Sequence, residues 1–319
     1  MKTNNSHKKL FADGGLTLIQ IILRFDTDDK ARKHLEAVLW KGGIVCPHCQ
    51  CKDQAKFSDI KPNPAVKTRA GLRWCSDCKK PFTVTVGTVF EDSKIPLRKW
   101  LIAWYLICSS KKGISSLQLQ RILELGSYRT ALFMAHRIRH ALKQESFEDK
   151  LSGTVEADEC HVPVGANEPD AKRATKHCRV FSMVERGENG RVRSQVVSGS
   201  NLKEIIRENV QIASELHTDQ HPGFTGLGVK YYHHAIKHRA GEFKRVEGNH
   251  LTTTASVESF FSLLKRGIVG TFHHVSEQHL PLYVAEFDHR HNCRRISDGE
   301  RTDVGLQMSV GKRLIYKRP

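Results

Sequence analysis

Two CxxC pairs constrain the fold of this chain more than any other feature of its sequence. They are Cys46-Pro47-His48-Cys49 and Cys75-Ser76-Asp77-Cys78, with 25 residues between them. Each pair can place two thiolates on one tight turn, and two facing turns form a closed tetrahedral site that suits zinc. We therefore predict a structural Zn²⁺ in a small ribbon over residues 41–92, with these ligands: Cys46, Cys49, Cys75 and Cys78.

Two neighbouring side chains are also possible zinc ligands by their chemistry. His48 and Cys51 lie beside the first pair, but neither completes a second one. The alternative to a metal site is four buried free thiols, which requires two CxxC pairs to coincide by chance. The other cysteines are scattered and are interpreted as small buried residues: Cys108, Cys160, Cys178 and Cys293.

The charge of the chain points to a polyanionic partner. Its 319 residues carry 51 Lys and Arg against 34 Asp and Glu, a net charge of +17. Such a surplus is typical of proteins that bind nucleic acid or an anionic membrane. The apolar run near 16–23 is too short to span a bilayer, and residues 1–15 lack the pattern of a signal peptide. We expect DNA rather than a membrane as partner, and a reducing cytoplasm for the cysteines.

Residues 93–150 have the outline of a helix-turn-helix. Helices are predicted over 94–110, 115–123 and 127–144, with Gly126 in the turn before the last. An apolar stripe on the last helix would face inward, which leaves basic residues for the other faces: Arg129, Arg137, Arg139 and Lys143. These are the predicted DNA contacts of a recognition helix. A helical bundle with a solvated basic face is the alternative, and the charge balance favours DNA.

From residue 154 the periodicity changes to that of an α/β domain. Strands are predicted over 154–158, 215–219 and 229–233, a hairpin over 179–185 and 192–197, and helices over 201–213 and 256–266. Three acids stand where a metal-dependent nuclease needs them. Asp158 and Asp219 each end a predicted strand, and Glu258 lies on the last helix, seven residues before Lys265.

Three such carboxylates can hold two Mg²⁺ ions beside a phosphodiester. The alternative is that they are ordinary surface acids, since a chain of this length offers many. Their competitors in the sequence are Glu156, Glu159, Glu286 and Asp288.

Several long stretches carry a resemblance that favours the catalytic interpretation. They include VCPHC, GTVFEDSKIPLRKWLIAWYLI, KGISSLQLQRILEL, GTVEADE, HTDQHPGF and VESFFSLLKRGIVGTFHHVSEQHL. From about Phe25 to Asn292 the chain resembles bacterial insertion-sequence transposases of the DDE class, with an N-terminal zinc ribbon and an ISXO2-like catalytic domain.

The resemblance implies an RNase H-like catalytic domain and metal-dependent DNA cleavage and strand transfer, with Mg²⁺ or Mn²⁺. By motif, Asp158, Asp219 and Lys265 match catalytic positions, and Arg266 and Arg290 are expected to contact DNA. The implied partners are the terminal inverted repeats of the element, target DNA and further copies of the chain on that DNA.

Three positions depart from the family pattern. Many relatives have Asn three residues before the Glu of the VES segment, where this chain has Ala255; Cys293 replaces a second Arg, and His161 replaces Tyr. If relatives need this Asn in the site, the present protein is either impaired or uses Glu258 alone as its third ligand. Two alternatives therefore stay open: a catalytically impaired zinc-ribbon DNA-binding protein, and a structure-specific nuclease of the RNase H-like class.

The predicted fold class is α+β with several domains. The expected parts are an N-terminal helical segment over 1–40, a zinc ribbon over 41–92 and a helical DNA-binding segment over 93–150. An RNase H-like catalytic domain over 151–310 and a basic tail over 311–319 follow.

Overall fold

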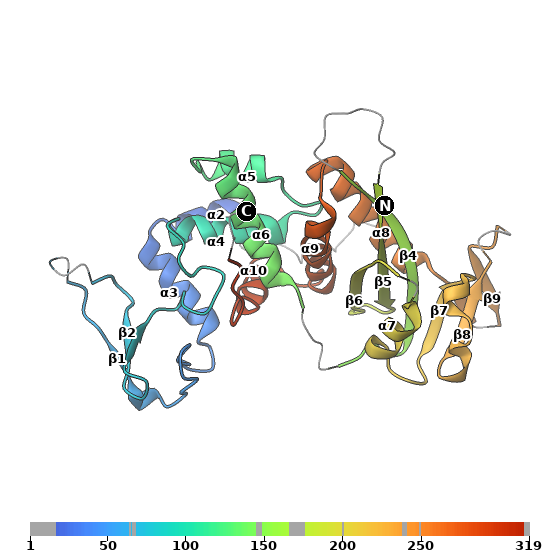
Figure 1. The fold of residues 1–319 in the computed structure, drawn as a ribbon, viewed down its shortest axis with the longest axis horizontal. Coiled ribbons are helices and arrows are strands. Elements are labelled where there is room, and N and C mark those ends of the chain that lie inside the picture. The colour runs from blue at the N-terminus through green and yellow to red at the C-terminus, as the bar shows by residue number, and fades with distance from the viewer. Residues whose placement is uncertain are drawn as a thin grey trace, which may run out of the picture. The chain divides into compact units, whose positions relative to one another are not determined.

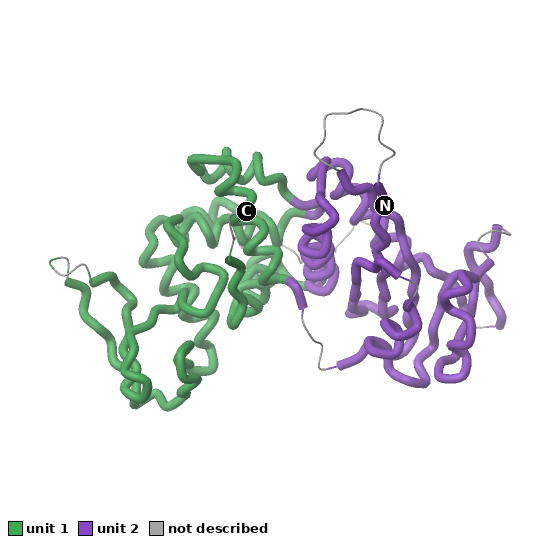
Figure 2. The backbone as a smooth tube through the Cα atoms, in the orientation of Figure 1, with its two compact units in different colours: residues 1–110, 114–142, 296–319 green, residues 111–113, 143–295 purple. Residues whose placement is uncertain are grey.

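The computed structural model describes residues 17–63, 65, 68–144, 149–165, 176–199, 201–237, 241–248 and 250–315. The chain divides into two compact units. Unit 1 holds residues 1–110, 114–142 and 296–319, and unit 2 holds 111–113 and 143–295 (Figure 2). Most of the predicted N-terminal segment before α2 and the end of the predicted basic tail lie outside the described residues.

Unit 1 combines a small sheet with a helical core (Figure 1). Its helices are α2 (Leu18–Arg24), α3 (Asp28–Leu39), α4 (Leu97–Ser109), α5 (Ser116–Ile122), α6 (Tyr128–Leu142) and α10 (Asp298–Gln307). The antiparallel sheet β1-β2-β3 is formed by β1 (Phe57–Asp59), β2 (Arg73–Cys75) and β3 (Lys80–Phe82).

The apolar α4 is the centre of the helical core. Trp100 and Trp104 are almost fully buried, and Phe90 lies against both rings, with centroid distances of 5.4 and 5.2 Å. Helix α10 packs against α3, α4 and α6. Its Gly305 permits this close approach, because a Cβ there would lie 2.8 Å from Trp104 Nε1.

Unit 2 is built on a five-stranded mixed sheet in the order β6-β5-β4-β7-β8. The strands are β4 (Thr154–Val164), β5 (Lys176–Glu185), β6 (Val192–Val197), β7 (Glu215–Asp219) and β8 (Tyr232–Ile236). The first three form an antiparallel meander, whereas β7 and β8 run parallel to β4. This order and direction confirm the predicted RNase H-like fold.

Helices cover both faces of this sheet. On one face α7 (Leu202–Asn209) shares a core with odd-numbered β4 residues such as Val155 and Ala157. On the other, α8 (Ala255–Gly267) and α9 (Leu280–Asn292) share a core with even-numbered β4 residues such as Cys160. A separate hairpin of β9 (Lys244–Glu247) and β10 (His250–Thr253) immediately precedes α8.

The structure corrects several predicted boundaries in unit 1. Within the predicted N-terminal helical segment, residues 17–40 form two helices, because Thr27 caps α3 by accepting a hydrogen bond from the Lys30 amide at 3.3 Å. Residues 82–86, with the sequence FTVTV, have the alternation of a β-strand, but only Phe82 lies in one. Hydroxyls of the threonines that follow make local hydrogen bonds, such as Thr88 Oγ1 to Thr85 O at 2.7 Å, which compete with strand pairing.

Unit 2 also differs from the prediction. Asp158 does not end its strand, because β4 continues to Val164. Helix α7 ends at Asn209 rather than 213, and β8 begins at Tyr232 because Leu227–Val229 forms a short 3₁₀ helix. The predicted end of the catalytic domain at 310 differs as well, since α10 belongs to unit 1.

Candidate active site and zinc ribbon

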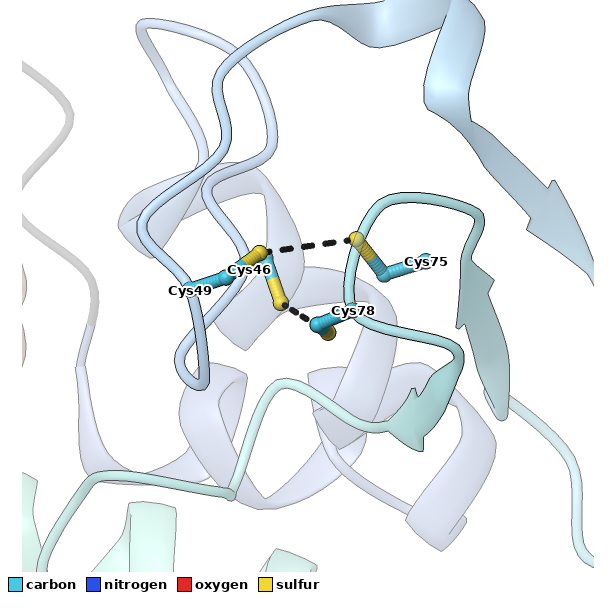
Figure 3. A group of neighbouring side chains, drawn as sticks. All are labelled: Cys46, Cys49, Cys75 and Cys78. Carbon is cyan, nitrogen blue, oxygen red and sulfur yellow. Dashed lines mark hydrogen bonds between the residues drawn. The ribbon is translucent and has the colours of Figure 1, made fainter.

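The four predicted zinc ligands converge in unit 1. Their Sγ atoms all lie within 4.8 Å of one another (Figure 3). Cys46 Sγ is 3.7 Å from Cys78 Sγ, and Cys49 Sγ is 3.7 Å from Cys75 Sγ. A tetrahedron with Zn–S bonds of ~2.3 Å places its sulfurs about 3.8 Å apart, whereas a disulfide needs about 2.05 Å. The geometry therefore fits Zn²⁺ and excludes disulfide pairing among the four.

The protein environment favours the thiolate of Cys75 but not that of Cys78, whose pKa burial raises to about 12. The Cys78 backbone amide, opposed by burial, lowers the pKa of Cys75 to about 7. His48 and Cys51 are not part of the four-sulfur group; His48 Nε2 lies 3.3 Å from the Pro81 carbonyl. The ribbon buries few side chains, chiefly Cys46, Cys75 and Phe82. Metal binding must therefore supply much of its stability.

The parallel pairing of β4 with β7 places Asp158 beside Asp219 in unit 2. The register pairs Glu156 with His217, so the next residues on the same face of each strand are Asp158 and Asp219. This is the face that α8 covers. Sequence reasoning identified the two acids, but only the register explains how they meet.

Glu258 completes the acidic site from the first turn of α8. Its Oε1 accepts a hydrogen bond from Thr254 Oγ1 at 2.9 Å. Burial, opposed by a hydrogen bond from the Glu159 amide and reinforced by the charges of Asp219 and Glu258, raises the pKa of Asp158 to about 7. The three predicted carboxylates therefore interact electrostatically, and each extra negative charge costs free energy unless a cation is present.

The donor set suits a hard divalent cation. Carboxylate oxygens are the ligands that Mg²⁺ and Mn²⁺ prefer. The acids are nevertheless spaced more widely than the cysteines. In the part of the chain that the structure describes, only the four cysteines and the group Glu215, His217 and His250 bring three or more ligand atoms within 4.8 Å of one another.

Glu156 is a buried acid whose role sequence reasoning missed. It has no exposed surface, and its Oε2 accepts hydrogen bonds from the backbone amides of Ser256 and Val257 at 2.6 and 3.1 Å. These are free N–H groups at the start of α8, where a negative charge is stabilised. Glu156 thus fixes the helix that carries Glu258 to the strand that carries Asp158. No signal in the sequence distinguished this acid from its neighbours.

Arg186 holds Glu156 in place and ties the β9–β10 hairpin to the same point. Its Nε donates to Glu156 Oε1 at 2.6 Å. Its Nη1 and Nη2 donate to the carbonyl oxygens of Leu251 and Thr253 at 2.8 and 3.0 Å. Arg186 is therefore a second positioning residue, which joins β4, β10 and the start of α8.

The other competing acids also have structural partners. Glu159 lies on the α7 face of β4, opposite to Asp158, and forms an ion pair with Arg179 at 2.6 Å. Asp288 Oδ1 accepts from Ser194 Oγ at 2.7 Å, and burial raises its pKa to about 7. The family position of His161 suggested that it touches the site, but His161 lies on the same face of β4 as Glu159 and so faces away from Asp158.

Three predicted DNA contacts are not on the surface. Arg137 is 7% exposed and donates to the Glu91 carbonyl at 2.6 Å, and Arg139 is fully buried. The placement of both on outer faces of α6 is therefore wrong, because nine of its fifteen residues are buried. Arg290 is also 7% exposed and forms an ion pair with the buried Glu286 at 2.5 Å.

The remaining basic candidates are exposed. Helices α5 and α6 and the turn between them form as predicted, and Arg129 stands in the first turn of α6, with Lys143 just beyond its end. In unit 2, Lys265 and Arg266 are exposed near the end of α8. Lys265 lies close enough to β4 to act electrostatically on Cys160. The contact of these four residues with DNA stays a prediction.

The raised pKa of Asp158 gives a pH-dependent stability. In Mg²⁺-free buffer, ionisation of Asp158 opposes folding, so unit 2 should lose stability as the pH rises from about 4 to about 7. Asp158→Asn should escape this loss. The free energy of opening of β4, measured by hydrogen exchange at each pH, should be equal in the two proteins near pH 4. It should be up to about 4 kcal/mol higher in the variant above pH 7. A constant difference across this range would contradict the assigned pKa.

Comparisons with known proteins agree with this architecture. A model of a transposase zinc-ribbon domain matches residues 26–81, and a model of an ISXO2-like transposase domain matches residues 150–292. The first match contains the four cysteines, and the second contains Asp158, Asp219 and Glu258. Among the described residues, no helix is long and apolar enough to cross a membrane.

One relative extends over nearly the whole chain. It is an uncharacterised protein in the transposable element ISH50 of Halobacterium salinarum, 25% identical over 310 residues. The alignment covers 91% of this chain and 99% of that protein. By these matches, its RNase H-like sheet and its zinc ribbon, the chain combines a transposase zinc-ribbon domain with an ISXO2-like transposase domain, and it is similar to an insertion-sequence protein.

Proposed function

We propose that this protein cleaves DNA at the ends of an insertion sequence and joins the freed ends to target DNA. The observation that carries the proposal is the interaction of Asp158, Asp219 and Glu258 at one face of the sheet. The match to an ISXO2-like transposase domain supports it. In a chain of net charge +17, such an acidic group can serve to hold cations beside a phosphodiester.

In this proposal the three carboxylates would hold Mg²⁺ or Mn²⁺. When bound, the metal supplies Lewis-acid activation of the attacking oxygen and stabilisation of the leaving oxygen. The protein orients the reaction. Glu156 and Arg186 keep Glu258 close to Asp158, and Lys265, exposed on the same helix, would contact a phosphate of the bound strand.

Two displacements give the overall reaction. Water attacks the phosphorus at the element's end, the bond to the 3′ oxygen breaks, and the products are a 3′-OH and a 5′-phosphate. The 3′-OH then attacks a target phosphodiester, forms a new bond to phosphorus and releases a target 3′-OH. The Asp158 carboxyl must lose its proton before it can bind a cation.

An assay with full-length protein and DNA that carries the element's terminal repeats tests the proposal. Nicking at the repeat ends and a joined product are expected with Mg²⁺ or Mn²⁺ and not without a divalent cation. Binding without cleavage would instead support the impaired DNA-binding protein, which Ala255 favours. Cleavage of branched DNA irrespective of repeats, without joining, would identify a structure-specific nuclease.

The helix-turn-helix contributes a separate test of DNA binding. Arg129→Ala should weaken binding to different DNA sequences about equally, and the slope of log K against log salt should fall by about one, as expected for a lost phosphate contact. Arg137→Ala is the matched comparison. Its buried guanidinium should affect the stability of unit 1, which holds all four tryptophans and can be followed by their fluorescence, more than the salt slope. An unchanged salt slope for Arg129→Ala would remove this residue from the DNA interface.

A further inference from the structure

A second group of possible metal ligands lies in unit 2, apart from the acidic site. Ligand atoms of Glu215, His217 and His250 lie within 4.8 Å of one another. Glu215 and His217 are alternate residues of β7, so they face the same side of the sheet. His250 begins β10, in the hairpin that precedes α8. The group thus joins two segments that are separate in the sheet topology.

The three side chains point at a common centre. Glu215 Oε1 contacts Nε2 of His217 and lies 3.1 Å from Nε2 of His250. His217 has no exposed surface, and the glutamate is partly buried. Two imidazole nitrogens and one carboxylate oxygen are a recurrent ligand set for transition metals in proteins.

A fourth imidazole stands beside these three. The parallel register of β7 and β8 pairs His217 with His234. The His234 ring centroid is 4.7 Å from that of His250 and 5.6 Å from that of His217. Small rotations of the side chain would bring one of its nitrogens to the same centre. The group therefore offers the four ligands of a tetrahedral site.

Two details of the histidine contacts matter for metal binding. The Nε2 of His250 is buried and makes no hydrogen bond with any described residue, although Glu215 is within ion-pair distance. The other nitrogen of His217, Nδ1, lies 3.3 Å from the Thr253 carbonyl. The Thr253 amide also lies 3.3 Å from Nδ1 and donates to it in the other tautomer. In the tautomer with hydrogen on Nδ1, donation to the carbonyl leaves Nε2 as the ligand atom, which is the arrangement found behind most metal-bound histidines.

We propose that Glu215, His217 and His250, with His234 as the fourth ligand, bind a transition-metal ion of the zinc class. Imidazole ligands favour Zn²⁺ over Mg²⁺, which prefers oxygen. The ion would fasten β10 to β7. Because β10 leads directly into α8, it would stiffen the segment that carries Glu258. This inference does not depend on the proposed cleavage activity.

Zinc analysis of the full-length chain, purified without a histidine tag, tests the proposal. Wild-type protein should hold one zinc in the ribbon and a second in this group. His250→Ala should lose one zinc, and Cys75→Ser should lose the other. His177→Ala, which removes an exposed imidazole from β5, should lose neither. A wild-type chain with a single zinc, absent from Cys75→Ser, would overturn the proposal.

Cobalt substitution distinguishes a built site from adventitious binding. Co²⁺ in the ribbon gives strong thiolate-to-metal charge-transfer absorption, whereas Co²⁺ on nitrogen and oxygen ligands gives only weak d–d bands. His250→Cys should retain the second metal and add charge-transfer absorption, since a thiolate replaces an imidazole at the same centre. Retention of that metal without the new absorption would show that His250 is not a ligand, and this would also overturn the proposal. Excess Mg²⁺ should not displace the ion.

Discussion

Asp158→Ala and Asp219→Ala are each expected to abolish DNA cleavage. The loss should exceed about 10³-fold, the upper range for one lost transition-state contact, because each removes a carboxylate that would hold the catalytic cation. DNA binding should stay the same or become slightly tighter, since the change also removes negative charge beside a phosphate. Cleavage and binding should be measured on the same end-repeat DNA with Mg²⁺.

Glu159→Ala is the matched control for Asp158→Ala. It removes an acid from the adjacent position of the same strand, but one that faces α7 and pairs with Arg179. It should cleave normally. If both variants lost cleavage equally, the strand itself would not tolerate substitution. If both variants cleaved DNA as fast as the wild type, Asp158 would be excluded from catalysis.

Glu258→Ala is expected to abolish cleavage too, and Ala255 provides a contrast. Ala255 is exposed at the start of α8, three residues before Glu258 and therefore on nearly the same side of the helix. If an amide belongs to the site, Ala255→Asn should raise activity; if Glu258 suffices, the rate should change little. Full cleavage by Glu258→Ala would show that another residue is the third ligand. Glu286 is a poor candidate for that role, because it is buried and paired with Arg290.

Cys75→Ser should release the ribbon zinc and unfold residues 41–82, whereas Val84, Val89 and Phe90 pack in the helical core and should stay in place. The segment buries few side chains of its own, and structural zinc sites contribute about 10–16 kcal/mol of apparent binding free energy. Loss of one ligand should therefore remove most of the ribbon's stability. Zinc content and limited proteolysis of this segment measure the effect, and unit 2 should stay folded.

Cys51→Ser serves as the control for the ribbon. Cys51 packs against the cluster without joining the four-sulfur group. Hydrogen bonding to Asp77 and burial raise its pKa to about 11, so it stays a thiol. This variant should keep its zinc. Undiminished ribbon zinc in Cys75→Ser would show that another side chain, such as His48, completes the site.

The local sequence correctly predicted those elements that depend mainly on interactions between residues close together in the chain. The two CxxC pairs predicted the zinc site, since each pair is one turn of backbone. Alternating apolar residues predicted the β5–β6 hairpin and β7, and β7 matches its predicted bounds, Glu215–Asp219. Asp158 and Asp219 were predicted as site residues, although Asp158 was wrongly placed at the end of its strand.

Burial was decided only by the tertiary structure. Helical periodicity separates one face from another, but it does not reveal how many neighbours surround a helix. The sequence therefore placed Arg137 and Arg139 on outer faces of α6, whereas packing in the fold buries both. Arg290 was likewise expected on DNA and is instead paired with Glu286.

The sequence by itself determined the metal-binding turns, the class of fold and the acids that stand on neighbouring strands. Only the tertiary structure distinguished one acid from another, because that depends on partners distant in sequence. Glu156 meets the amides at the start of α8, 100 residues away, whereas Asp158, two positions further, meets other carboxylates. The same long-range contacts bring His250 to Glu215 and His217. Strand register and helix docking decide which distant residues come into contact, and no local sequence pattern predicts either of them.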